Sequence, residues 1–100
     1  MDRNRTGQGP KVRARLVILG WVQGVYFRAS ARDVARAQRL FGWVRNRLDG
    51  AVEAVVEGEK AAVQAFVAWC QHGPPGAQVT EVQVTMESYA DEYQGFRIVK

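Results

Sequence analysis

The chain has 100 residues, of which 47% are hydrophobic and 24% charged, and its formal net charge is +4 at pH 7. This length suits one domain with one core, and no apolar run approaches the roughly 18 to 20 residues that a membrane-spanning helix needs. Because Cys70 is the one cysteine, an intrachain disulfide and a cysteine-based zinc site are excluded. The composition predicts a soluble, cytoplasmic protein.

The amino-terminal residues 1–10 carry Arg3 and Arg5 but no charged-then-apolar targeting pattern. Their Gly, Asn, Gln and Pro content predicts a disordered tail ahead of a domain over residues 11–100. A first strand follows, where alternation indicates one buried face: Val12, Ala14, Leu16 and Ile18 alternate with Arg13, Arg15, Val17 and Leu19.

Residues 27–41 show the period of an amphipathic helix. Its apolar face contains Phe27, Ala31, Val34 and Phe41, and an adjacent stripe contains Arg28, Arg32, Arg36 and Arg39. The stripe is either a solvated face or a positive funnel that concentrates a phosphorylated substrate. Gly42 is expected to cap the helix at its carboxyl end.

The rest of the chain alternates between strand and helix patterns. We predict a strand over 43–48, a turn at Asp49-Gly50, a partner strand over 52–58, a helix over 59–71, a strand around 82–86 and a short strand over 95–99. The β-α-β-β-α-β order predicts an α+β, ferredoxin-like sandwich, in which a mostly antiparallel sheet carries two helices on one face. This fold hosts enzymes, RNA binders and metal carriers, so the site residues must decide the function.

The segment 20–28, Gly20-Trp21-Val22-Gln23-Gly24-Val25-Tyr26-Phe27-Arg28, joins the first strand to the first helix. A turn that enters a helix presents backbone N–H groups without intrahelical partners, and Gly20 and Gly24 permit positive φ. Arg28 can direct a planar fork at two phosphoryl oxygens. The segment is therefore either an anion cradle or an ordinary loop beside a solvated arginine.

Asn46 shares a strand face with Val44 and Leu48 by alternation, so its amide needs a partner. It is either a structural amide bonded to neighbouring backbone, or an amide that faces a bound phosphate and holds a water molecule in line with phosphorus.

Two motifs resemble the two signatures of the acylphosphatase family. G-x-V-Q-G-V-x-F-R occupies residues 20–28, and Gly42-Trp43-Val44-Arg45-Asn46, with Asp49-Gly50 and Val52-Glu53, is similar to G-W-V-x-N-x-x-x-G-x-V-E. Gly73-Pro74-Pro75-Gly76-Ala77 and Gly95-Phe96 with Ile98 are similar as well, so the resemblance covers about residues 11–100.

The resemblance implies that the protein hydrolyses the carboxyl-phosphate anhydride of an acyl phosphate, by in-line attack of water. One histidine, one cysteine and scattered carboxylates offer no recognisable set of metal ligands, so we expect no metal or other cofactor. The family's phosphate-binding arginine corresponds to Arg28, and its water-orienting asparagine corresponds to Asn46. The phosphate cradle corresponds to Val22, Gln23, Gly24, Val25, Tyr26, Phe27 and Arg28.

No nucleophile is evident, since Cys70 is predicted on the buried side of its helix and His72 has no recognisable acid partner. An acyl phosphate tolerates this, because its carboxylate leaves without protonation.

The chain departs from the family pattern at two places. Arg47-Leu48 stands where a leucine–proline pair is common, so we expect a looser turn and an arginine within reach of the acyl end. Trp21 stands at a variable position, where it either lines the pocket mouth or covers the core edge.

Two other functions stay open. The charge and element order permit an RNA-binding module, although Gly95-Phe96-Arg97-Ile98 is similar to an aromatic RNA-binding strand only in part and Phe96 is predicted in the core. The second is an accessory role, because similar domains occur within larger carbamoyl-transfer maturation proteins. We expect a standalone monomeric enzyme for a small-molecule substrate, with no nucleic-acid or membrane partner.

Overall fold

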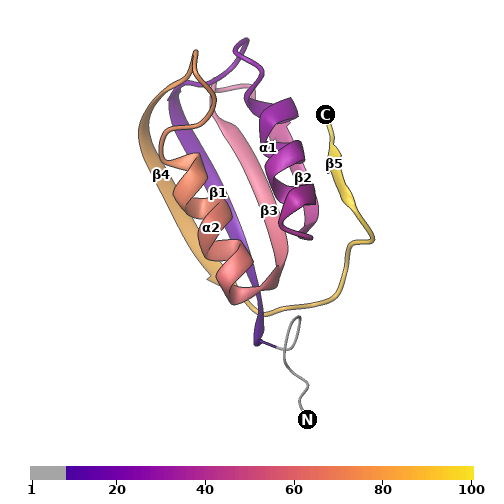
Figure 1. Ribbon diagram of the computed structural model, residues 1–100. Coiled ribbons are helices and arrows are strands. Elements are labelled where there is room, and N and C mark those ends of the chain that lie inside the picture. Colours follow the sequence, from indigo (N-terminus) through magenta and orange to yellow (C-terminus); the bar gives the residue numbers. More distant parts are fainter. Residues whose placement is uncertain (1–8) are drawn as a thin grey trace.

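The computed structural model describes residues 9–100 (Figure 1). In chain order the elements are β1 (Lys11–Trp21), α1 (Phe27–Ala37), β2 (Phe41–Asn46), β3 (Val52–Glu59), α2 (Lys60–Cys70), β4 (Gln78–Glu87) and β5 (Phe96–Ile98). The predicted β-α-β-β-α-β order and the short final strand are confirmed. Residues 1–8 of the predicted tail lie outside the described residues.

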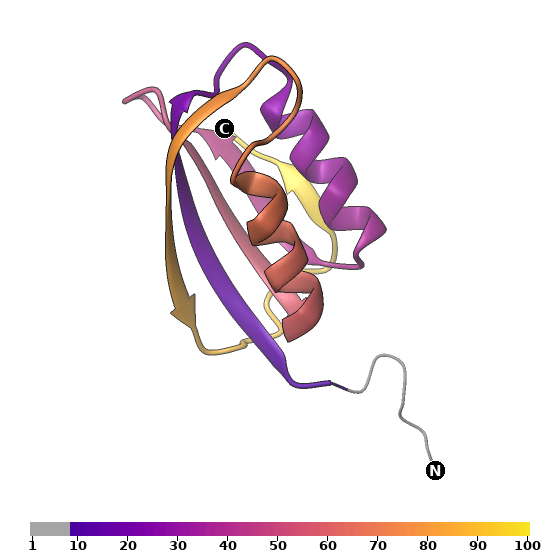
Figure 2. The ribbon, with the colours of Figure 1, turned by 60° about the vertical axis from the view of Figure 1, so that its left-hand side comes forward.

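The strands form one five-stranded sheet in the order β4-β1-β3-β2-β5. β2 and β5 pair in parallel, and the other neighbours pair antiparallel. The alternation predicted for β1 is confirmed, because Ala14, Leu16 and Ile18 are fully buried. Both helices cover the same face of the sheet (Figure 2), so the predicted ferredoxin-like α+β sandwich is confirmed.

The core lies between the helices and the sheet, and aromatic rings connect its parts. The rings of Phe66 on α2 and Phe96 on β5 lie 6.0 Å apart between centroids, and those of Phe27 and Trp69 lie 5.2 Å apart. Phe96 and Cys70 are buried, as predicted. Because Phe27 is the first residue of α1 and is itself buried, core packing fixes the helix start and the loop before it.

The first helix is shorter than predicted, since the helix expected over 27–41 ends at Ala37. Arg39 adopts φ 59°, and the N–H of Leu40 donates back to a carbonyl of the last turn at 2.9 Å. The chain therefore reverses before Phe41, which begins β2 with its side chain 40% exposed instead of lying on the helix's apolar face.

Gly42 lies inside β2 and is not the predicted helix cap. The strand predicted over 43–48 is observed as Phe41–Asn46, and the N–H of Gly42 donates to the carbonyl of Gly95 at 2.8 Å. An added Cβ at Gly42 would lie 1.8 Å from the carbonyl oxygen of Val55. Glycine is needed here because β3 approaches closely.

The remaining elements fit the expected pattern with small shifts. α2 and β3 differ from the predicted ranges by one residue at their ends. β4 is longer than predicted, because its pairing with β1 continues past an irregularity between Leu19 and Gly20 of β1. Within residues 9–100, neither helix is long and apolar enough to cross a membrane.

The sheet face opposite the helices carries an ion-pair network. The carboxylate of Glu53 accepts from Arg15 Nη1 at 3.0 Å and from Arg45 Nε at 2.8 Å. Both guanidinium groups lie about 6 Å from the centre of the Trp43 ring. This face is therefore partly filled by the protein's own side chains.

The connection between β4 and β5 crosses the same face. The backbone N–H groups of Ala90 and Glu92 both donate to the buried carboxylate of Glu57 at 2.9 Å. The hydroxyl of Tyr93 accepts from Arg13 and from Trp43. The sheet face without helices is thus partly covered by the chain itself.

We expect Glu53 to make folding stability depend on pH. Burial raises the pKa of its carboxyl, but the hydrogen bonds from Arg45 and Arg15 outweigh burial and the folded-state pKa is lowered. The resulting stabilisation is complete above the unfolded pKa of about 4.3 and is lost as pH falls through the folded pKa. Glu53→Gln should therefore lower the free energy of unfolding at pH 7, and its difference from the wild type should shrink below about pH 4.3.

Urea denaturation at both pH values checks this expectation. Glu81→Gln, which changes an exposed carboxylate on β4, serves as the control and should show a smaller difference at pH 7. A difference between wild type and Glu53→Gln that stays constant with pH would contradict the role assigned to Glu53.

Candidate active site

Three strands end at the same edge of the sheet. β1 and β2 both run antiparallel to β3, and β5 runs parallel to β2. The register places Ile18 of β1 and Asn46 of β2 on either side of Val52. The loop that follows β1 therefore lies close to Asn46, the last residue of β2.

The loop between β1 and α1 contains two left-handed backbone positions, Gly24 with φ 77° and Tyr26 with φ 65°. An added Cβ at Gly24 would meet nothing within 4 Å, so a side chain would have room there. Glycine is favoured at this position because of its positive φ. Within the described part of the chain, the N–H groups of residues 23–28 donate to no backbone carbonyl. Unpaired N–H groups at a helix N-terminus can bind an anion.

Arg28 and Asn46 line one cavity of about 380 Å³. The side-chain oxygen Oδ1 of Asn46 is buried and has no hydrogen-bond partner within residues 9–100. A buried acceptor without a partner costs stability. Because Asn46 lines the cavity, this oxygen is a candidate acceptor for a donor that binds there.

The cavity gathers most of the predicted site residues. Its lining consists of Val22, Gly24, Tyr26, Phe27, Arg28 and Asn46, together with Ala29 and Ile98. The side chains of Gln23 and Val25 are not part of that lining. Ile98 was missed because its strand pattern does not tell at which sheet edge the strand ends. The catalytic roles of Arg28 and Asn46 stay predictions.

The model of the acylphosphatase family matches residues 14–98, a range that contains both Arg28 and Asn46. The chain belongs to the acylphosphatase family. The membership predicted from the two motifs, and with it the class of enzyme, is confirmed.

Relatives and solved structures agree with this membership. An acylphosphatase of Pelotomaculum thermopropionicum is 50% identical over 88 residues, which make up 88% of this chain and 96% of the relative. The crystal structure of acylphosphatase from Bacillus subtilis matches with a TM-score of 0.86 and 38% identity, over 89% of this chain and 99% of the other. Full-length HypF in its phosphate- and nucleotide-bound form matches with a TM-score of 0.85 and 31% identity, over 98% of this chain and 13% of HypF.

Gln23, part of the first acylphosphatase motif, joins the loop to a neighbouring turn. Its side-chain Nε2 donates to the carbonyl oxygens of Arg47 and Ala51, at 2.8 and 2.9 Å. The two acceptors belong to the turn between β2 and β3, directly after Asn46. Sequence reasoning placed Gln23 in the cradle for its backbone N–H and missed this side-chain role.

Gln23→Ala should lower the free energy of unfolding by about 1 to 3 kcal/mol, because it removes two hydrogen bonds of about 0.5 to 1.5 kcal/mol each. Each carbonyl oxygen keeps a backbone donor, the N–H of Gly50 for Arg47 and the N–H of Arg47 for Ala51. Gln23→Glu should cost at least as much, since it places a carboxylate against both carbonyls. Chemical denaturation of the two variants measures the effect. A fully stable Gln23→Glu variant would contradict the donor role.

The turn between β2 and β3, where we expected a looser connection, is closed by its own hydrogen bonds. The N–H of Arg47 donates to the carbonyl of Ala51 at 2.8 Å, and the N–H of Ala51 donates to Asp49 Oδ1 at 3.1 Å. The bond from Ala51, with help from Arg47, lowers the pKa of the Asp49 carboxyl. The Arg47 guanidinium lies 2.8 Å from Asp49, within its own turn.

Trp21 has neither of the two roles left open for it. Its side chain is 71% exposed, so it does not cover the core edge, and it is not part of the cavity lining.

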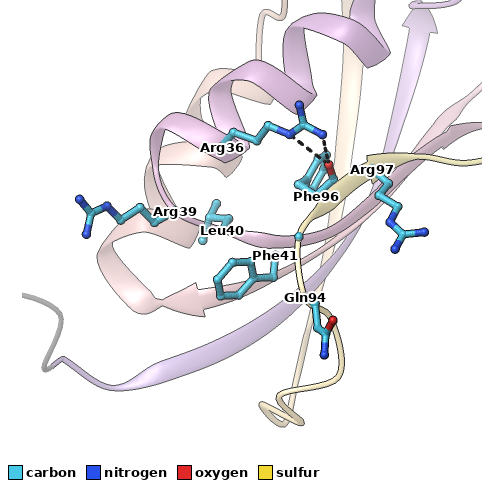
Figure 3. Close-up of a pocket in the computed structure, with 8 residues that line it drawn as sticks. Arg36, Arg39, Leu40, Phe41, Gln94, Phe96 and Arg97 are labelled. Carbon is cyan, nitrogen blue, oxygen red and sulfur yellow. Dashed lines mark hydrogen bonds between the residues drawn. The ribbon is translucent and has the colours of Figure 1, made fainter.

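A larger groove of about 510 Å³ lies at the other end of α1 (Figure 3). Arg36, Arg39 and Arg97 line it, and the side chains of Arg39 and Arg97 extend away from one another. Arg36 donates from Nε and Nη2 to the carbonyl of Phe96, at 3.2 and 3.0 Å. The arginines of the predicted stripe therefore differ in their surroundings. Arg28 lines the cavity, whereas Arg36 connects α1 to β5.

Neither residue considered as a nucleophile lies at the cavity. Cys70 is fully buried in α2, and burial raises the pKa of its thiol. His72 is exposed beyond the end of α2. Residues 9–100 contain no group of three His, Cys, Asp or Glu side chains that could hold a metal ion.

Proposed function

We propose that the protein hydrolyses acyl phosphates to a carboxylate and inorganic phosphate by direct in-line attack of water. The observation that carries this proposal is the shared cavity, which is lined by Arg28 and Asn46 and follows the loop of residues 23–28. Within residues 9–100, the N–H groups of that loop donate to no backbone carbonyl, and Oδ1 of Asn46 has no hydrogen-bond partner. Family membership supports the reaction class. The cavity lining includes an arginine that can bind a phosphoryl group and an amide that can bind a water molecule.

The phosphoryl group binds against the backbone N–H groups of residues 22–28 at the start of α1. The helix dipole adds partial positive charge there, and the guanidinium of Arg28 bridges two oxygens. These groups stabilise the negative charge on the equatorial oxygens during transfer, the task that magnesium performs in many phosphoryl-transfer enzymes.

Asn46 holds the attacking water. Its Oδ1 accepts a hydrogen from the water, whose oxygen then points at phosphorus. The new bond between the water oxygen and phosphorus forms while the bond from phosphorus to the acyl oxygen breaks, and the carboxylate leaves with the electron pair. One water proton passes to a phosphoryl oxygen, so the reaction requires neither a protein nucleophile nor a general acid.

We also propose that residues 11–100 act as the domain of a monomeric, cytoplasmic enzyme for a small-molecule substrate, without a nucleic-acid or membrane partner. The family match over residues 14–98 supports these bounds, and a single buried cysteine suits a reducing compartment. Light scattering of the purified protein should give the mass of one chain.

The test is hydrolysis of benzoyl phosphate by the purified protein in EDTA, with a simple phosphate monoester as the control. We expect rapid cleavage of the anhydride and no turnover of the monoester, because a carboxylate leaves without protonation and an alkoxide does not. A folded protein that cleaves neither compound overturns the proposal.

A further inference from the structure

The rim of the cavity has a different character from its floor. Among the lining residues, three are exposed: Gly24, Tyr26 with a side chain 83% exposed, and Ile98 with 36%. Arg28 and Asn46 are less exposed than these three. A bound molecule that projects out of the cavity therefore meets apolar and aromatic groups at the rim, with no charged side chain among them.

Tyr26 combines two unfavourable features. It adopts the left-handed conformation, with φ 65° and ψ 23°, although a bulky residue rarely does. Its aromatic ring is exposed, and its side chain makes no capping hydrogen bond to α1. Strained positions of this kind concentrate at ligand-binding sites, where a contact with the ligand explains why such a residue is present.

In-line attack determines which part of the substrate reaches Tyr26. The attacking water and the departing acyl oxygen must lie on opposite sides of phosphorus. Because the Oδ1 of Asn46 is buried, the water occupies the inner side of the cavity. The acyl group therefore points outward, past the rim.

We propose that Tyr26 is a specificity-determining residue that favours acyl phosphates with a flat, apolar acyl group, such as an aromatic ring. The inference rests on the proposed function, since it assumes the water position at Asn46. The Tyr26 ring offers a face for stacking or edge contact, and Ile98 adds apolar surface beside it. A small acyl group such as acetyl is too short to gain from either contact.

The experiment compares kcat/KM for benzoyl phosphate and acetyl phosphate, expressed as a ratio. Both substrates share the phosphoryl group, so a general change in the cradle cancels in this ratio. Tyr26→Asn removes the ring while keeping a residue that tolerates positive φ. We expect the benzoyl-to-acetyl ratio to fall by about three- to tenfold, the rate equivalent of one aromatic contact.

Two further variants make the result specific. Tyr26→Phe keeps the ring and should keep the wild-type ratio. Trp21→Ala removes another exposed aromatic side chain, one that does not line the cavity, and should also keep the ratio.

An unchanged ratio in Tyr26→Asn, or an equal fall in Trp21→Ala, overturns the role of Tyr26 and leaves the proposed function intact. A folded wild type that hydrolyses neither acyl phosphate overturns the proposed function, and this inference with it.

Discussion

Replacing Arg28 with alanine should lower kcat/KM for benzoyl phosphate by roughly 10²- to 10³-fold, the usual cost of losing one well-placed oxyanion donor. Arg28 lines the cavity and belongs to the loop-and-helix segment whose N–H groups, at residues 23–28, donate to no backbone carbonyl within residues 9–100. The variant should also lose most of its inhibition by inorganic phosphate, because the same group binds the product. α1 packs on the core through other residues, so the free energy of unfolding should change by less than about 1 kcal/mol.

Arg32→Ala is the matched control for Arg28→Ala. Arg32 lies one turn further along α1, pairs with Asp33 at 3.3 Å and does not line the cavity. Its removal should leave turnover near the wild-type value. Arg28→Lys should recover only part of the activity, because an ammonium keeps the charge but not the planar fork. Near-normal turnover in a folded Arg28→Ala variant would rule out the assigned role.

The strand pattern could be predicted because the two faces of β1 meet different surroundings. Leu16 and Ile18 pack beneath the helices, while Arg15 faces the ion-pair network on the other side. Such alternation can be read from sequence alone. The β-α-β-β-α-β order then determines that β1 and β2 end at one sheet edge, where the two motifs meet.

The end of α1 could not be predicted for a physical reason. Phe41 lies at a spacing that continues the helix's apolar face, so periodicity favours a longer helix. The observed end depends on Arg39 in a left-handed conformation, a position where glycine is usual. An arginine at position 39 does not indicate from the sequence that the chain reverses there.

In the site, too, local features could be predicted and long-range contacts could not. Arg28 and Gly24 lie within one short motif, so their positions at the start of the helix follow from neighbouring residues alone. The bonds of Gln23 to the turn after β2, and the place of Ile98 in the cavity, depend on how distant strands assemble. Neither contact follows from residue type or spacing.

The second large expected effect concerns the buried oxygen of Asn46, which has no hydrogen-bond partner within residues 9–100. Asn46→Ala should lower kcat by about 10²-fold, because a water molecule that is no longer held in line seldom attacks phosphorus. Inhibition by inorganic phosphate should change by less than about twofold, since the phosphoryl group binds to Arg28 and the backbone. Steady-state kinetics with phosphate as the inhibitor separates the two quantities, and equal losses in both would contradict a water-holding role.

The free energy of unfolding of the Asn46→Ala variant provides an independent test of the role of Asn46. A structural amide would satisfy its neighbours, and its removal would lower the free energy of unfolding. The Asn46 oxygen accepts from no group within residues 9–100, so its removal breaks no hydrogen bond between that oxygen and the rest of the fold. Asn46→Ala should therefore be about as stable as the wild type in chemical denaturation, despite its loss of turnover. Lost activity at undiminished stability is the combination expected of a residue kept for catalysis, whereas a clear loss of stability would point to a structural amide.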